Sequence, residues 1–365
     1  MTDPLLQLKP GSRIGILGGG QLGRLLALSA AELGFDCVVY EPEQDCPAGR
    51  VGARCFQAAW DDWESLAAFA QSVDVITFEF ENVPAAALAF LAEKKPIRPG
   101  LRSLQLTQDR LFEKQFLHSL GLKTAPFAAV DHLDGLNHAV AQIGTPAILK
   151  VRTLGYDGKG QVRLCTLEDS AAAWFKLKGQ ACVLEGIVPF EREVSVIVAR
   201  GGDGRLAHFD VTENVHQDGI LRTSSVPARI STSVETAAVA AATQISHALD
   251  HIGVLAVEFF VLADGGLIVN EIAPRVHNSG HWTQDGCAAS QFQQHIRAIA
   301  HWPLATTQRL SAQVIMTNLI GYDVDAWPQL SQKENGYLHL YGKRQVREGR
   351  KMGHITELYG FGEGP

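Results

Sequence analysis

Two glutamates lie in apolar segments that a short turn connects. Glu258 belongs to the run 257–262, Glu271 belongs to the run 267–272, and the residues ADGG at 263–266 are typical of a hairpin turn. In a symmetric turn, residues whose numbers add up to 529 face each other, so Glu258 is predicted to face Glu271. Directly opposed side chains on a sheet lie about 5 Å apart, where like charges repel.

This pair of carboxylates needs either a shared proton or a cation between its members. Asn270 adds a further oxygen beside Glu271. Mg²⁺ prefers oxygen ligands and is often held partly by substrate phosphate. We therefore predict that Glu258 and Glu271 are metal ligands. The alternative is a purely structural pair of acids, which would leave the repulsion uncompensated.

Three further candidates follow in a segment with neither helical nor strand periodicity. Arg275 can hold an anion, His277 can move a proton, and Asn278 opens the run NSGHW. Each of them alone is compatible with an ordinary loop. Their position directly after two acids favours a reaction site.

A lysine interrupts the apolar strand predicted for residues 147–151, and packing alone does not explain Lys150. The segment RTLGYDGKGQ at 152–161 follows, with three glycines and both signs of charge. Such a connection between antiparallel strands can fold its amides over a polyphosphate, whereas a plain hairpin needs only a few residues. Further along, Glu193 alternates with valines, so it projects from the polar face of a strand. It is either an exposed acid or an acceptor for a ribose hydroxyl.

The N-terminal part carries a different motif. Gly18, Gly20 and Gly23 form a Gly-x-Gly-x-x-Gly pattern between the predicted strand 13–17 and a predicted helix. The turn points backbone amides at a ligand, and the helix dipole favours an anion there. Glu41 ends the next strand, where a dinucleotide-binding enzyme keeps its ribose-binding acid. These residues alone leave both a nicotinamide dinucleotide site and a turn that serves only packing open.

The elements around this motif predict a parallel α/β layer over the first 100 residues. A third strand at 73–78 ends in Glu79 and Glu81. Acids at the carboxyl end of such a strand face the crevice where ligands bind in open α/β sheets, although a solvated strand end is the plainer interpretation.

A linker, KKPIRPG, separates this layer from the next helix. Thr107 is predicted to cap a helix over 108–120. Arg110 and Lys114 then lie four residues apart on one helical face.

Composition narrows the functional classes. The 365 residues suffice for two or three domains, and the net charge of −7, without a basic run, argues against a nucleic-acid partner. Six scattered cysteines without metal-binding spacing indicate reduced thiols in a cytoplasmic protein. The most apolar long stretch, 253–269, is interrupted by acids and glycines, so no membrane span is expected.

Five segments together resemble the ATP-grasp superfamily and, more narrowly, the ATP-dependent 5-(carboxyamino)imidazole ribonucleotide synthases of purine biosynthesis. They are GGGQLGR, GYDGKGQ, HQDGILRTS, NEIAPRVHNSGHWTQ and GRKMGHI. The likeness runs in order from Arg13 to Ile355. It implies an α/β and α+β chain: an ATP-grasp fold with an N-terminal Rossmann-like (pre-ATP-grasp) domain and a small C-terminal domain.

The resemblance also implies domain boundaries. The N-terminal Rossmann-like domain would cover 1–105, the small lid domain with its leading helix 106–205, the large domain 206–300 and the C-terminal substrate-binding segment 301–365.

ATP and Mg²⁺ are the cofactors that the resemblance implies. Arg110 and Lys150 would contact the phosphates, Glu193 the ribose and His216 the nucleotide, while Asn270 would lie beside the metal ligands Glu258 and Glu271. The closing flap would consist of Gly155, Tyr156, Asp157, Gly158, Lys159, Gly160 and Gln161. The adenine hinge would consist of Glu185, Gly186, Ile187 and Val188.

The implied substrates are aminoimidazole ribonucleotide and bicarbonate. Gln21 and either Glu79 or Glu81 would face the ribonucleotide, and Lys343 and Arg350 would bind its phosphate. The bicarbonate and aminoimidazole pocket would be lined by Tyr156, Asp157, Lys159, Arg275, His277 and Asn278. Some relatives carry arginine at the position of Lys159. A lysine there cannot make the bidentate contact to an anion that arginine makes.

The implied reaction transfers the γ-phosphoryl group of ATP to bicarbonate, and the resulting carboxyphosphate carboxylates the exocyclic amine of the ribonucleotide. A homodimer acting on small molecules is implied as well. Three alternatives stay open: a formate-dependent glycinamide ribonucleotide transformylase, a NAD-dependent dehydrogenase and a non-catalytic ATP-binding module. A dehydrogenase would leave the second half of the chain without a purpose.

Overall fold

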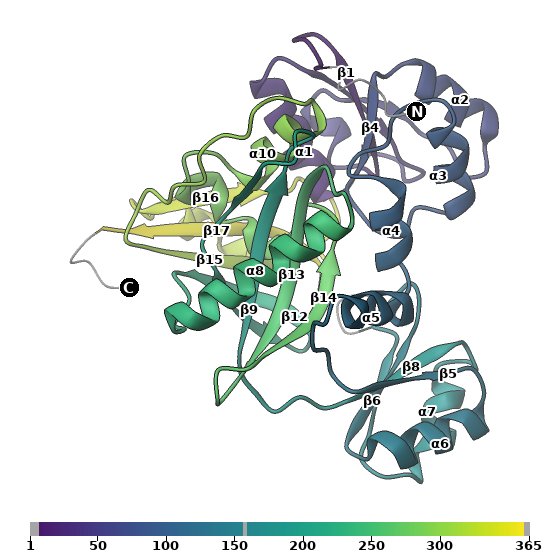
Figure 1. Ribbon diagram of the computed structural model, residues 1–365. Coiled ribbons are helices and arrows are strands. Elements are labelled where there is room, and N and C mark those ends of the chain that lie inside the picture. The colour runs from purple at the N-terminus through teal and green to yellow at the C-terminus, as the bar shows by residue number, and fades with distance from the viewer. Residues whose placement is uncertain (1–6, 156–158, 361–365) are drawn as a thin grey trace.

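The computed structural model describes residues 7–155 and 159–360, and within them the chain forms three sheets. Figure 1 shows the N-terminal unit above, a small unit below right, and a large sheet that continues to the C-terminus. In these described residues, no helix has the length and apolar character needed to cross a membrane.

The N-terminal unit is a parallel sheet in the order β3-β2-β1-β4. Its elements are β1 (Arg13–Leu17), α1 (Gln21–Glu32), β2 (Asp36–Tyr40), β3 (Arg54–Phe56), α2 (Trp63–Gln71), β4 (Val75–Phe78) and α3 (Ala85–Ala92), with a 3₁₀ turn, η1 (Gly49–Val51), before β3. The predicted alternation of strands and helices is confirmed. All four strands are short, and β1 and β4 are almost entirely buried.

Two helices connect this unit to the rest: α4 (Leu101–Thr107) and α5 (Arg110–Ser119). The prediction that Thr107 caps one helix over 108–120 is wrong, because Thr107 ends α4 and its hydroxyl donates back to Ser103 O at 3.0 Å. The cap of α5 is Asp109, whose carboxylate accepts from Leu111 N at 2.9 Å. The predicted helix is therefore interrupted after Thr107, and α5 begins at Arg110.

The small unit is an antiparallel sheet in the order β5-β8-β6-β7, with two helices on one face. Its elements are β5 (Phe127–Val130), α6 (Leu133–Ile143), β6 (Ala147–Val151), β7 (Gln161–Leu164), α7 (Asp169–Lys176) and β8 (Cys182–Gly186). Leu136, Leu149 and Leu184 belong to a buried cluster that this unit does not share with the other two. The unit therefore has its own core, and we call it the lid unit.

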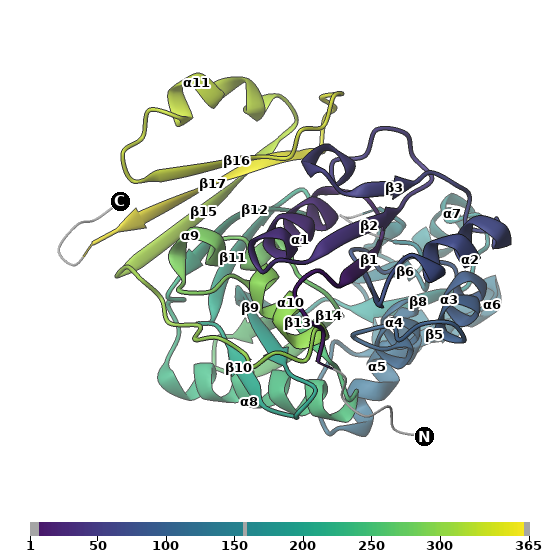
Figure 2. The same cartoon turned by 90° about the horizontal axis from the view of Figure 1, so that it is seen from above.

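The large sheet has nine strands in the order β14-β13-β9-β11-β12-β15-β17-β16, with β10 paired to β9 (Figure 2). Its strands are β9 (Phe190–Arg200), β10 (Leu206–His208), β11 (Thr212–Gln217), β12 (Ile220–Val226), β13 (Gly253–Leu262), β14 (Leu267–Ala273), β15 (Gln313–Ile320), β16 (Gly336–Leu340) and β17 (Lys351–Tyr359). Its helical segments are α8 (Thr232–Ala248), η2 (Asn278–Gly280), α9 (Thr283–Gly286), α10 (Gln291–Ile299), η3 (Gly321–Ala326) and α11 (Trp327–Leu330).

The two faces of the large sheet bury different partners. Val194, Val196 and Val198 of β9 pack on the α8 side. Ile197 faces the opposite side, in one cluster with Leu26 of α1 and residues of α10. The N-terminal unit and the large sheet therefore share a core, unlike the lid unit.

Two predicted domain boundaries do not match these units. A boundary between residues 205 and 206 would fall in the loop of the β9–β10 hairpin, because β9 belongs to the large sheet and not to the lid unit. A boundary at 300 would separate β12 from β15, although these strands are paired. The C-terminal segment thus extends the large sheet.

Candidate active site

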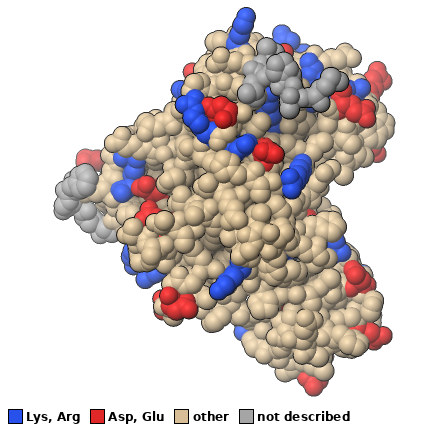
Figure 3. All heavy atoms as spheres, viewed as in Figure 1, with Lys and Arg blue, Asp and Glu red and all other residues tan. Residues whose placement is uncertain are grey.

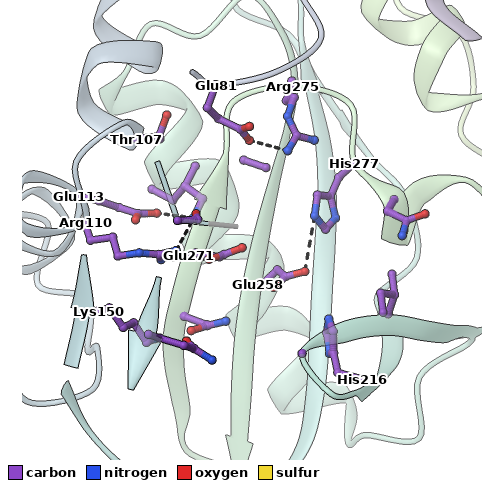
Figure 4. A pocket seen from close by; sticks show the side chains of 18 of the residues that line it. Glu81, Thr107, Arg110, Glu113, Lys150, His216, Glu258, Glu271, Arg275 and His277 are labelled. Carbon is purple, nitrogen blue, oxygen red and sulfur yellow. Dashed lines mark hydrogen bonds and ion pairs between the residues drawn. The ribbon is translucent and has the colours of Figure 1, made fainter. Parts of the chain in front are cut away.

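A cavity of about 510 Å³ lies where the three units meet. It brings together residues that are far apart in sequence and that the sequence analysis proposed as site residues (Figure 4). Those residues are Gln21, Glu81, Arg110, Lys150, Gly155, Gln161, Glu193, His216, Glu258, Asn270, Glu271, Arg275, His277 and Asn278.

The predicted pairing of Glu258 with Glu271 is confirmed by the register of β13 and β14. The symmetric turn assumed for it is wrong, since Val261 faces Leu267 and the numbers near the turn add up to 528. Between Phe259 and Glu258, a bulge at Asn270 shifts the register by one residue. On the side of the bulge away from the turn, the numbers of facing residues therefore add up to 529, and Glu258 faces Glu271.

The two carboxylates lie in different environments. Glu258 is buried, while the side chain of Glu271 is 42% exposed and lies 3.5 Å from Arg110 Nη1. Burial and the charge of Glu271 raise the pKa of Glu258 to about 7. A divalent cation between the two would remove this repulsion, so the donor set fits Mg²⁺ with further oxygens from a phosphate. The described residues contain no group of three or more such side chains that could hold a metal ion alone.

Glu113 is a site residue that the sequence analysis missed. It lies on α5, it is buried, it lines the cavity, and its carboxylate accepts the amide hydrogen of Ile272. Burial and the charge of Glu271 raise the pKa of Glu113 to about 8. Its position one helical turn after Arg110 was the available signal, because residues three apart share a helix face.

A buried carboxylate orients the cavity lysine. Lys150 Nζ lies 3.0 Å from Glu185 Oε2, and Lys114 Nζ lies 3.3 Å from the same oxygen. Although burial opposes ionisation, the two lysines lower the pKa of Glu185. The Glu185 side chain therefore holds Lys150 in place by an ion pair, whereas the family resemblance implied that Glu185 belongs to the adenine hinge.

Arg275 and His277 both contact acids of the cavity. Arg275 Nη2 lies 2.6 Å from Glu81 Oε1, and His277 Nε2 lies 3.7 Å from Glu258 Oε1. Burial and the charge of Arg275 hold the pKa of His277 well below its ordinary value, so the imidazole is neutral near pH 7.

His216 and Glu193 form a pair in the cavity wall, with 2.9 Å between Nδ1 and Oε2. Burial opposes the charged form of His216, but the bond to Glu193 and the charges of Glu258 and Glu193 raise its pKa. A protonated imidazole at this place adds a positive charge to the wall.

The glycine turn binds carboxylates of its own chain. Glu79 accepts from Gly20 N at 2.5 Å and from Gly23 N at 2.9 Å, and Glu41 accepts from Gly19 N at 2.8 Å. An added Cβ on Gly20 would lie only 2.5 Å from Glu79 Oε1. The anion expected at the start of α1 is thus an internal one. Of the two acids left open, Glu81 lines the cavity and Glu79 lies under the turn.

Other predicted residues lie elsewhere or outside the description. Lys343 Nζ donates to Lys351 O at 2.7 Å and Arg350 donates to Gln345 O at 2.9 Å; in the described part of the chain, the cavity wall includes Lys351 and neither of these two. Tyr156, Asp157 and Gly158 lie outside the described residues. The remaining predicted residues, Lys159, Gly160, Gly186, Ile187 and Val188, are described but do not line the cavity.

Three family models match successive parts of the chain. Residues 12–108 match a ribonucleotide synthetase preATP-grasp domain, residues 115–292 an ATP-grasp domain, and residues 314–359 a phosphoribosylaminoimidazole carboxylase C-terminal domain. An N5-carboxyaminoimidazole ribonucleotide synthase of Brucella melitensis is 53% identical over 353 residues, which cover 96% of this chain and 97% of that protein. The chain belongs to the N5-carboxyaminoimidazole ribonucleotide synthase family.

Solved structures of this family have the same fold. The crystal structure of an ADP complex of an N5-carboxyaminoimidazole ribonucleotide synthetase has a TM-score of 0.94 at 42% identity, covering 98% of this chain and 94% of that one. A synthase of Aspergillus clavatus in complex with ADP and 5-aminoimidazole ribonucleotide has a TM-score of 0.89 at 31% identity, covering 96% and 94%. The ATP-grasp fold with a pre-ATP-grasp and a C-terminal unit is confirmed.

The raised pKa of Glu113 predicts a pH-dependent stability. Between its ordinary value of 4.5 and about 8, the folded protein holds a proton that the unfolded chain has released, so the free energy of unfolding falls as pH rises. Glu113→Gln lacks this effect and keeps an acceptor for the Ile272 amide. In metal-free buffer, we expect the stability of the variant relative to the wild type to rise by about 4 kcal/mol between pH 5 and pH 8.5, measured by urea unfolding.

The control is Glu235→Gln on the exposed side of α8. It should follow the wild type across the same pH range. Parallel stability curves of Glu113→Gln and the wild type would show that Glu113 ionises normally in the folded protein.

Proposed function

We propose that this protein carboxylates 5-aminoimidazole ribonucleotide with bicarbonate, at the expense of ATP, to give the 5-carboxyamino ribonucleotide, ADP and phosphate. The observation that carries the proposal is the opposed pair Glu258 and Glu271 in one cavity with Arg110 and Lys150. Family membership supports the choice of substrates.

Phosphoryl transfer takes place first. A bicarbonate oxygen bonds to the γ-phosphorus, and the bond from that phosphorus to the β–γ bridging oxygen breaks, which gives carboxyphosphate and ADP. Lys150, oriented by Glu185, and Arg110 balance negative charge on the phosphates. Glu258 and Glu271 would hold Mg²⁺, which supplies further charge neutralisation on the phosphate oxygens when bound.

The nucleotide would bind between the lid unit and the large sheet. Glu193 would accept a ribose hydroxyl, and His216 beside it would face the nucleotide. The hinge 185–188 stays the predicted adenine site. Phe190 and Phe260, which stack with ring centroids 4.5 Å apart, add an apolar surface to the same cavity.

Carboxylation follows inside the closed cavity. Carboxyphosphate breaks into carbon dioxide and phosphate, and the amine nitrogen bonds to the carbon and loses a proton. Arg275, held by Glu81, would orient the acyl phosphate. Closure of the flap 155–161 would exclude water before the labile intermediate forms.

We also propose Mg²⁺ dependence, a homodimer and a cytoplasmic location. The acid pair supports the metal, and the six cysteines, all free, fit a reducing compartment. On the face in Figure 3, charged side chains of both signs are scattered with no single basic patch, which supports small-molecule partners over nucleic acid.

ADP release tests this function. The purified protein should release ADP with Mg²⁺, bicarbonate and aminoimidazole ribonucleotide together, and not with formate and glycinamide ribonucleotide. The reverse result would favour the transformylase alternative. No ADP release with either pair would contradict a ligase.

Lys150→Ala should lower the rate of ADP release by about 100-fold or more, because a phosphate-neutralising charge is lost. The fold should persist, since Lys114 still pairs with Glu185. The measurements are ADP release and thermal unfolding, with Lys176→Ala on the exposed face of α7 as control. Turnover equal to that of the control would exclude Lys150 from the site.

The family resemblance gives Arg350 a role at the ribonucleotide phosphate, although its side chain does not line the cavity in this structure. If it binds that phosphate in the complex, Arg350→Ala should raise the KM for the ribonucleotide about tenfold and leave the KM for ATP within about twofold, because a lost phosphate contact affects only the ligand that makes it. Arg347→Ala, an exposed arginine of the same segment, is the control. Equal changes in the two KM values would show that the basic C-terminal segment does not bind the ribonucleotide.

A further inference from the structure

A chain of buried hydrogen bonds leads from His277 away from the cavity. It passes through η2, β9, β11 and β12, and each link is 2.7–2.9 Å long. The links join His277 Nδ1 to Ser279 Oγ, Ser279 Oγ to Ser195 Oγ, Ser195 Oγ to Asn214 Nδ2, and Asn214 Oδ1 to Ser224 Oγ.

The chain occupies positions where apolar side chains would otherwise pack. Ser279, Ser195 and Ser224 are 0% exposed and Asn214 is 5% exposed. Ser195 alternates with the buried valines of β9, and Asn214 faces Ser224 in register. Buried polar groups stabilise a fold little more than apolar ones do, and they are costly when unpaired. A complete chain that ends on a cavity residue therefore points to a role in the site.

Two independent donors determine the direction of this chain. The backbone amide of Ser279 points at His277 Nδ1 over 3.3 Å, and an amide N–H only donates, so Nδ1 must carry a lone pair. At the far end, Asn214 Nδ2 donates to Ser195 Oγ, whose hydroxyl then donates to Ser279 Oγ. The hydroxyl proton of Ser279 is left for Nδ1.

The nitrogen that faces the cavity then carries the proton. In a neutral imidazole with a lone pair on Nδ1, the ring hydrogen is on Nε2. His277 Nε2 lies 3.7 Å from Glu258 Oε1, which is longer than a hydrogen bond. The Nε2 proton can therefore be donated to a substrate oxygen in the same cavity.

We propose that Asn214, Ser195 and Ser279 are positioning residues that keep His277 in the Nε2–H tautomer, so that His277 donates a hydrogen bond to the bicarbonate-derived anion and does not act as the base. This inference rests on the proposed function for the identity of the anion. As the N–C bond forms, one C=O electron pair of carbon dioxide moves to its oxygen. The amine proton passes to the phosphate released from carboxyphosphate.

The tautomer is measured without any turnover. Protein labelled with ¹⁵N-histidine, without substrates and near pH 7.5, should show a His277 spectrum with a protonated Nε2 and an unprotonated Nδ1, assigned by its loss in His277→Ala. A protonated Nδ1 would overturn the proposal. Failure of the ADP-release assay would instead contradict the proposed function and leave this measurement valid.

Ser195→Ala interrupts the chain. We expect a second His277 tautomer in the spectrum and a kcat about tenfold lower with bicarbonate and ribonucleotide, with the KM for ATP changed by no more than about twofold. The matched control is Ser246→Ala in α8, where the hydroxyl is equally buried and has no hydrogen-bond partner among the described residues. If Ser195→Ala matches this control in tautomer and kcat, the chain does not position His277.

Discussion

Repulsion between neighbouring carboxylates, two of them buried, is the constraint around which the cavity is arranged. Glu258, Glu271 and Glu113 converge from two strands and a helix, and burial raises the pKa of both Glu258 and Glu113. Such an arrangement is unfavourable in the empty protein and becomes favourable when cations and phosphates enter together. Two cations are built into the same cavity: Arg110 lies beside Glu271, and Lys150 lies beside Glu185, so part of the acidic charge is already balanced by neighbouring side chains (Figure 4).

Local patterns predicted the strands and helices well where apolar periodicity was strong. The strands 13–17 and 147–151 have the predicted limits. Helix starts were less certain, because Thr107 and Asp109 both qualify as caps and only tertiary contacts decide between them. Asp109 also accepts from Arg152 over 2.7 Å, and this contact from the lid unit lies beyond what sequence spacing can show.

Most residues that line the cavity were predictable from the sequence, but the residues that hold them in place were not. The acid pair followed from the hairpin, yet the bulge that aligns it is invisible in an apolar pattern. Lys351 and the serines behind His277 depend on which strands are neighbours in the large sheet. Glu113 was accessible from its spacing to Arg110, but that its helix packs against β14 was not. The glycine turn shows the opposite case, where a strong local motif has its expected backbone form but binds Glu79 and Glu41 of the same chain.

The separate core of the lid unit has a kinetic consequence. The N-terminal unit and the large sheet share one buried cluster, whereas the lid unit encloses its own. A movement of the lid unit would disturb none of the apolar contacts that the N-terminal unit and the large sheet share. The wall contributed by Gln21, Glu81 and Arg275 could therefore stay assembled while the lid unit moves. The fold thus separates the part of the cavity wall that rests on a shared core from the part that the lid unit supplies.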